Sequence, residues 1–121
     1  MGKISELKAF KECPGAYVLA VNDTLNVING KWKAPIISTL FFGKKRFGEM
    51  AKEIPKITTR MLSKELRDLE ANGIVTRTVH DTIPVTVEYE LTKSGHLFRD
   101  VLDVMLEWGL QHRKSVMKKK K

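Results

Sequence analysis

The sequence predicts an α+β fold that is mostly helical, with short helices first, then one β-hairpin and a long C-terminal helix. Two observations carry this prediction. Apolar residues recur at helical spacing between residues 18 and 72, and again after Thr92. Between these segments, residues 85–91 alternate strictly between apolar and polar side chains, which is typical of a half-buried strand.

Length and composition predict one globular domain spanning residues 1–121. The chain is 42% hydrophobic and 30% charged, both ordinary for globular proteins. No apolar run reaches the ~18 residues of a transmembrane helix, and residues 1–11 lack the apolar segment of a signal peptide. A single cysteine excludes an intrachain disulfide framework. We therefore expect a cytoplasmic protein with no membrane partner.

The charge balance is basic but is concentrated at one end. The chain has 22 Lys and Arg against 14 Asp and Glu, a net charge of +8. Four of these lysines form a basic tail at residues 118–121, and without them the count is 18 against 14, or +4. This charge permits a polyanionic partner but does not require one. The tail itself is either a solubilising end or a contact to phosphates.

Two helices are expected after an N-terminal arm at residues 1–16. The first carries an apolar stripe and ends at the pair Asn29-Gly30, and the second ends at Gly43. Residues 44–46 are then the connection to the next helix. The apolar positions are Val18, Val21, Leu25 and Ile28 in the first helix, and Trp32, Ile36 and Leu40 in the second.

Residues 46–73 have the proportions of a helix-turn-helix motif. A short helix from Phe47 ends at Ile54 because Pro55 follows it. Either Thr58 or Thr59 caps the next helix, whose buried stripe is a set of leucines at i, i+4 and i+7. These leucines are Leu62, Leu66 and Leu69, and the pair Asn72-Gly73 stops the helix.

The hairpin at residues 74–92 follows at once and makes the motif a winged helix-turn-helix. Its expected strands are Val75–His80 and Val85–Leu91, so the wing is two-stranded, with Asp81–Pro84 at its tip. Thr92 caps the last helix, which covers residues 93–117 and contains Gly95 and Gly109 as weak points.

The outer face of the helix from Thr58 is the candidate DNA-binding surface. Its hydrogen-bonding and cationic residues lie mainly in the half of a recognition helix that enters the major groove. Arginine there can bind guanine O6 and N7 together. The candidate DNA-binding residues are Thr58, Thr59, Arg60, Ser63, Lys64 and Arg67, with Lys45 and Arg46 before the motif and Arg77 and His80 on the hairpin.

Two alternatives remain for these basic residues. Lysine and arginine on an amphipathic helix are often only solvated, and a winged helix can serve as a protein–protein docking module that binds no DNA. The conjunction of the helix face, the basic connection and the basic hairpin favours DNA.

The last helix is more apolar than one packing face requires. We expect it to contribute to its own core and to a homodimer, because two recognition helices ~34 Å apart contact a palindrome. The alternative is a single wide core face. The candidate dimerisation residues are Leu97, Val101, Val104, Met105 and Trp108.

No catalytic or metal site is expected. The three histidines, His80, His96 and His112, are scattered over the hairpin and the last helix without ligand spacing. No nucleophile and base can be paired from the sequence. We therefore expect a protein that is not an enzyme and has no cofactor or metal.

Four segments together resemble the HxlR family of bacterial transcription regulators. They are residues 25–33 (LNVINGKWK), 43–47 (GKKRF), 57–73 (ITTRMLSKELRDLEANG) and 84–92 (PVTVEYELT), and the resemblance covers roughly residues 19–112. It implies a dimeric, MarR-like winged-helix repressor or activator at a palindromic operator. It also implies that the helix from Thr58 is the recognition helix and that the terminal helices dimerise.

The resemblance also raises the question of Cys13. Some family members sense electrophiles or oxidants through a cysteine whose position falls near Leu19 here, six residues after Cys13. Pro14 is a good first-turn residue, so the sulfur of Cys13 could lie at a helix N-terminus, which favours thiolate. The alternatives are a redox sensor and an ordinary thiol packed in the N-terminal arm. A small-molecule effector is also compatible with the sequence.

Overall fold

The computed structural model describes residues 13–119, and side chains for residues 13–117. The chain divides into two compact units, Met1–Gly30 and Lys31–Lys121, which are described separately. No helix in the described part of the chain is long and apolar enough to span a membrane.

In the described part of the first unit, residues 13–30, the chain forms helix α2 (Pro14–Val27). Cys13 is its N-cap residue and Pro14 its first helical residue, so the predicted arm ends earlier than residue 16. The predicted end is confirmed, since Ile28 is the C-cap residue and Gly30 has a φ of +81°. Its large apolar side chains Tyr17, Val18, Leu19, Val21 and Leu25 are all exposed.

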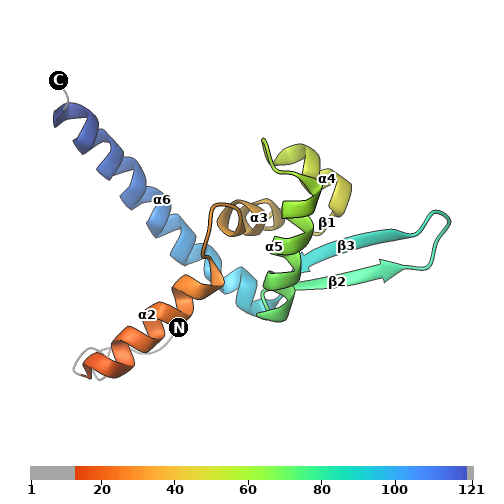
Figure 1. The fold of residues 1–121 in the computed structure, drawn as a ribbon, viewed down its shortest axis with the longest axis horizontal. Coiled ribbons are helices and arrows are strands. Elements are labelled where there is room, and N and C mark those ends of the chain that lie inside the picture. Colours follow the sequence, from red (N-terminus) through yellow and green to blue (C-terminus); the bar gives the residue numbers. More distant parts are fainter. Residues whose placement is uncertain (1–12, 120–121) are drawn as a thin grey trace. The chain divides into compact units, whose positions relative to one another are not determined.

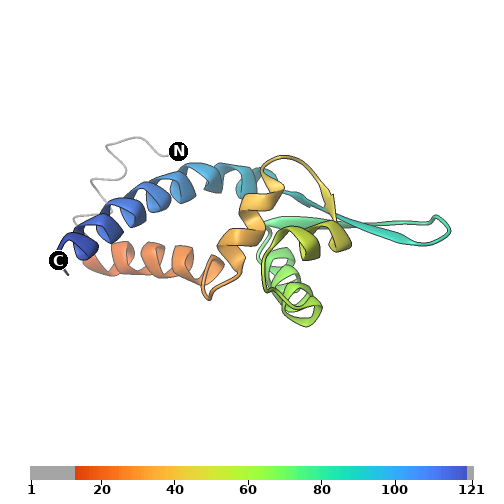
Figure 2. The ribbon, with the colours of Figure 1, turned by 90° about the horizontal axis from the view of Figure 1, so that it is seen from above.

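The second unit contains the predicted winged helix-turn-helix (Figure 1). Its helices are α3 (Lys33–Leu40), α4 (Phe47–Glu53), α5 (Thr59–Ala71) and α6 (Lys93–Lys119), and its strands are β1 (Lys45–Arg46), β2 (Val75–His80) and β3 (Thr86–Leu91). Helices α3, α4 and α5 gather at the base of the β2–β3 hairpin, whose tip extends beyond them (Figure 2).

The core of this unit joins the three short helices to the base of the sheet. The predicted leucine stripe of α5 is fully buried, which confirms the helical spacing as its cause. Each such side chain contributes roughly 1.5–3 kcal/mol when removed from water. The main core residues are Ile36, Ile37 and Leu40 of α3, Met50 of α4, Leu62, Leu66 and Leu69 of α5, and Ile74, Val75, Tyr89 and Leu91.

The sheet has three antiparallel strands in the order β1-β3-β2, whereas the sequence predicted two. Lys45 and Arg46 pair with Tyr89 and Glu88 of β3, so two residues predicted to belong to a connection form an edge strand. A strand of two residues is too short to show an alternating pattern, which is why the sequence did not indicate it. In the hairpin, Val75 faces Leu91 and the register continues to His80 opposite Thr86.

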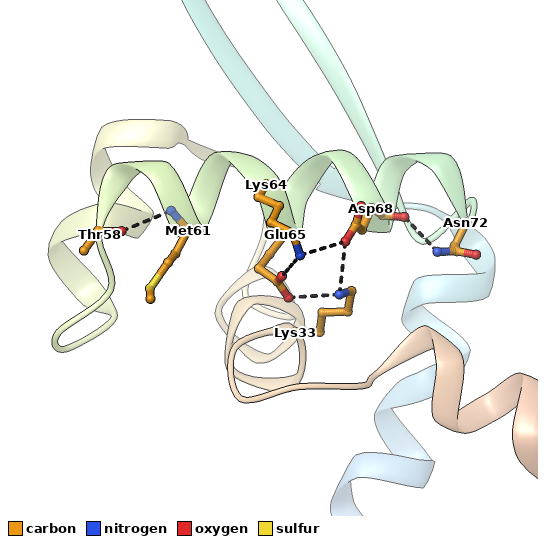
Figure 3. Close-up of polar contacts among 7 residues, drawn as sticks. All are labelled: Lys33, Thr58, Met61, Lys64, Glu65, Asp68 and Asn72. Carbon is orange, nitrogen blue, oxygen red and sulfur yellow. Dashed lines mark hydrogen bonds and ion pairs between the residues drawn. The ribbon is translucent and has the colours of Figure 1, made fainter.

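The ends of α5 are fixed by its own side chains and backbone. The Thr58 hydroxyl accepts a hydrogen bond from the Met61 N–H at 3.1 Å, which identifies Thr58 rather than Thr59 as the cap (Figure 3). At the other end Gly73 has a φ of +74°, and the Ile74 N–H donates to the Leu69 carbonyl at 2.9 Å. These hydrogen bonds satisfy backbone N–H and C=O groups that have no partner within the helix at its ends.

The start of α6 is held against the turn between α5 and β2. The Thr92 hydroxyl accepts from the Gly95 N–H at 3.1 Å and lies 2.6 Å from the Gly73 carbonyl oxygen, to which it donates. A Cβ atom at Gly95 would lie 2.4 Å from the Ile74 carbonyl oxygen. Gly95 is therefore required by a close backbone approach, which the prediction of a weak helical position missed.

Candidate nucleic-acid interface

The outer face of α5 is a polar surface opposite its buried leucines. Thr59, Arg60 and Arg67 are exposed on it, and Ser63 is half-buried at its edge. Helical periodicity produces this arrangement, because a buried stripe at i, i+4 and i+7 leaves the opposite side to solvent. The two arginines are therefore accessible to a partner that approaches this face.

Lys64 lies on the same face but is already paired. Its Nζ atom is 3.3 Å from Oε1 of Glu65 and 3.7 Å from Oδ2 of Asp68. The same two carboxylates bind Lys33 of α3, at 3.0 Å from Glu65 Oε2 and 3.3 Å from Asp68 Oδ2 (Figure 3). Lys33, Glu65 and Asp68 were not among the residues predicted from the sequence. Glu65 does carry a signal, because its helical position beside the leucines buries a carboxylate that needs a cation.

A groove of about 440 Å³ lies between α5, the start of α4 and the wing. It brings together three predicted residues from three elements: Ser63 of α5, Arg46 of β1 and Arg77 of β2. Both arginines are exposed. Phe47, Gly48, Val85, Thr86, Val87 and Tyr89 complete its lining. Guanidinium groups and a hydroxyl on a concave surface form a suitable site for a phosphate backbone.

Two other predicted residues have acidic partners. Lys45 Nζ lies 2.6 Å from Oε1 and 2.7 Å from Oε2 of Glu53, and its side chain is mostly buried. His80 Nε2 contacts the Glu88 carboxylate near the outer part of the hairpin. Their partners make both side chains less available to DNA than Arg46 and Arg77.

The predicted dimerisation residues all lie exposed on α6. Val101 is the least exposed at 37%, while Val104 and Trp108 are each 65% exposed. The ring of Trp108 stacks on His112 with 4.6 Å between centroids, a pair that the sequence analysis did not identify. An apolar surface of this extent on one helix is typical of a protein contact.

The remaining predicted site residue, Cys13, is exposed with its sulfur at the N-terminus of α2. Within residues 13–119, no three His, Cys, Asp or Glu side chains are grouped so that they could hold a metal ion.

Comparison with known proteins identifies the family. Residues 27–117 match the family model described as HxlR-like helix-turn-helix. A protein of Bacillus subtilis (strain 168) described as the HTH-type transcriptional regulator YtcD is 44% identical over 96 residues, which cover 79% of this chain and 76% of YtcD.

Solved structures agree with this match. The redox regulator HypR in its reduced form has a TM-score of 0.76 at 43% identity, over 82% of this chain and 98% of HypR. A structure from Enterococcus faecalis V583 described as a MarR-family transcriptional regulator has a TM-score of 0.72 at 36% identity, over 83% of this chain and 91% of that one. With its helix-turn-helix, wing and sequence match, the chain belongs to the HxlR-like family of helix-turn-helix transcriptional regulators.

Proposed function

We propose that this protein binds a palindromic operator as a homodimer and thereby represses or activates transcription. Helix α5 enters the major groove, and the wing contacts the adjacent backbone or minor groove. The observation that carries the proposal is the exposed set Thr59, Arg60 and Arg67 on α5, next to the groove that holds Arg46 and Arg77.

The two groups of residues have different tasks in this proposal. Arg60 and Arg67 contact base edges, where one bidentate arginine–guanine pair discriminates by ~1–3 kcal/mol. Arg46 and Arg77 contact phosphates, which position the protein without selecting a sequence. Ser63 lies between the two groups and supplies a hydroxyl to either surface.

The homodimer rests on α6. Its exposed residues Leu97, Val101, Val104, Met105 and Trp108 lie on a helix that extends away from the wing (Figure 1). A second copy would cover these side chains and place two recognition helices about one DNA turn, ~34 Å, apart.

The direct test is selection of bound sequences from random double-stranded DNA by the purified protein. We expect a palindrome, and affinity for it should fall steeply between about 50 and 200 mM salt because cations are released from phosphates. The variant R60A/R67A should lose operator binding while its mass in solution stays that of a dimer. The control R113A/K114A also removes two positive charges, but from exposed positions late in α6.

Three outcomes would contradict parts of the proposal. Operator binding retained by R60A/R67A would remove α5 as the recognition helix. A non-palindromic site bound by a monomer would remove the dimer. Absence of DNA binding by a folded dimer would favour the docking-module alternative, in which the apolar face of α6 binds another protein.

A redox effector is the second part of the proposal. Cys13 is exposed at the N-terminus of α2, where an oxidant can reach its sulfur, and the similar protein HypR is named a redox regulator. We expect diamide to change operator affinity in the wild type and not in C13S. An equal response of both proteins would exclude Cys13 as the sensor.

A further inference from the structure

Lys33 is a buried cation that links two helices of the DNA-binding unit. It is the first residue of α3, and it is only 4% exposed. Its ammonium group bonds to Glu65 and Asp68, which both belong to α5 (Figure 3). Because charge removed from water is costly unless it is paired, these bonds constrain how α5 lies on α3.

The same carboxylates also hold Lys64 of the candidate recognition face. Glu65 uses its Oε2 atom for Lys33 and its Oε1 atom for Lys64. Asp68 uses one atom, Oδ2, for both lysines. The four side chains therefore share two negative and two positive charges, and each lysine limits how strongly the carboxylates attract the other.

We propose that Lys33 is a positioning residue for DNA binding that acts through Lys64 without touching DNA. Lys33 partly neutralises Glu65 and Asp68 from the side of α5 that packs on α3. This weakens their attraction for Lys64, so Lys64 can exchange a carboxylate for a DNA phosphate. This inference rests on the proposed function of α5.

The consequence of losing Lys33 follows from the geometry. In K33M, Lys64 is the remaining lysine beside Glu65 and Asp68, so the two carboxylates hold it more tightly. The cluster also gains one net negative charge next to the recognition face. Lys64 then no longer reaches phosphate. We expect operator affinity to fall by about tenfold, which corresponds to a typical coupling between neighbouring charges.

A double-mutant cycle separates this role from a merely structural one. Operator affinity of K33M, K64A and K33M/K64A is measured by fluorescence anisotropy, on dimers shown by circular dichroism to be folded. At 0.15 M salt, where the Debye length is about 8 Å, more distant charge effects are screened. We expect K33M to weaken binding about tenfold in the wild-type background and at most about twofold in the K64A background.

The salt dependence gives a second readout. Because one lost phosphate contact lowers the slope of log affinity against log salt by about 0.9, K33M and K64A should each lower it by that amount. The double variant should lower it no further. Equal affinity losses in both backgrounds, with an unchanged slope in K33M, would overturn the proposal.

The variant K33M/E65L keeps the test informative if K33M does not fold. It replaces the buried pair with apolar side chains, a change that is often neutral or stabilising, and leaves the neutral pair Lys64–Asp68. We expect it to have wild-type affinity and slope, and K33R to approach the wild type. Weak binding by a folded K33M/E65L would refute the role of Lys33. Failure of the wild type to bind any selected operator would instead refute the proposed function.

Discussion

The substitution G95A tests whether the start of α6 depends on a close backbone contact. A Cβ atom there would lie 2.4 Å from the carbonyl oxygen of Ile74 and 3.0 Å from Cδ2 of Leu91. The leucine tip can rotate, but the carbonyl belongs to the backbone of the turn before β2. The carbonyl or the helix must therefore move by about 1 Å to restore an ordinary contact.

The expected loss follows from three contributions. Overpacking of this kind costs about 1–3 kcal/mol. The Ile74 carbonyl also accepts the Thr92 N–H at 2.9 Å, so its displacement disturbs the cap of α6, a loss of about 1 kcal/mol. Alanine has a helix propensity about 1 kcal/mol better than glycine, which offsets the cap. The free energy of unfolding should therefore fall by about 1–3 kcal/mol.

Urea denaturation followed by circular dichroism measures this change. All variants are compared at one protein concentration, because the stability of the proposed dimer would depend on concentration. The control is G109A in the same helix, where an added Cβ has no atom within 4 Å. It should be as stable as the wild type or more stable, by up to about 1 kcal/mol. If G95A behaves like G109A, the close approach at Ile74 does not constrain the fold.

Three further predictions concern the cap of α5, the wing and the proposed dimer surface of α6. T58A removes the acceptor of the Met61 N–H and should lower the free energy of unfolding by about 1 kcal/mol in urea melts, and an unchanged midpoint would exclude the cap. R77Q should weaken binding to operator and random DNA by similar factors and lower the salt slope by about 1, whereas loss confined to the operator would make Arg77 a base contact. V104E should convert the proposed dimer to a monomer in light scattering, because it places a charge among apolar side chains, and a dimer that persists would show that the interface does not include Val104.

The elements with strong periodicity were predictable from the sequence. The α5 helix combines a leucine stripe, a threonine cap and a terminal Asn-Gly pair, so local and tertiary preferences agree. The change to alternation before Leu91 identified β3, and Thr92 correctly marked the start of α6. The exposed positions of α5 could be predicted because they lie on the side of the helix opposite its buried leucines. Arg60 and Arg67 are two of these exposed positions.

Long-range pairings were not predictable. Strand β1 is defined by its hydrogen bonds to β3, more than 40 residues later, and by no pattern of its own. The partners of Lys33, Lys45 and His80 lie on other elements or across the hairpin, so no local sequence pattern indicated these ion pairs. The role of Gly95 depended on the position of a carbonyl that only the folded turn provides.

The two-residue strand β1 has a mechanical consequence for an operator-bound protein. Arg46 is hydrogen-bonded into the sheet through β3 and is followed directly by Phe47, the first residue of α4, with no linker between them. The wing and α4, the first helix of the helix-turn-helix, are therefore expected to move together as one rigid body. A force applied by DNA on the hairpin would reach α4 through this strand, so the wing and the helix-turn-helix should contact a half-site at a fixed separation. Inserting one base pair between the two contact sites on the DNA should therefore weaken binding to the whole half-site.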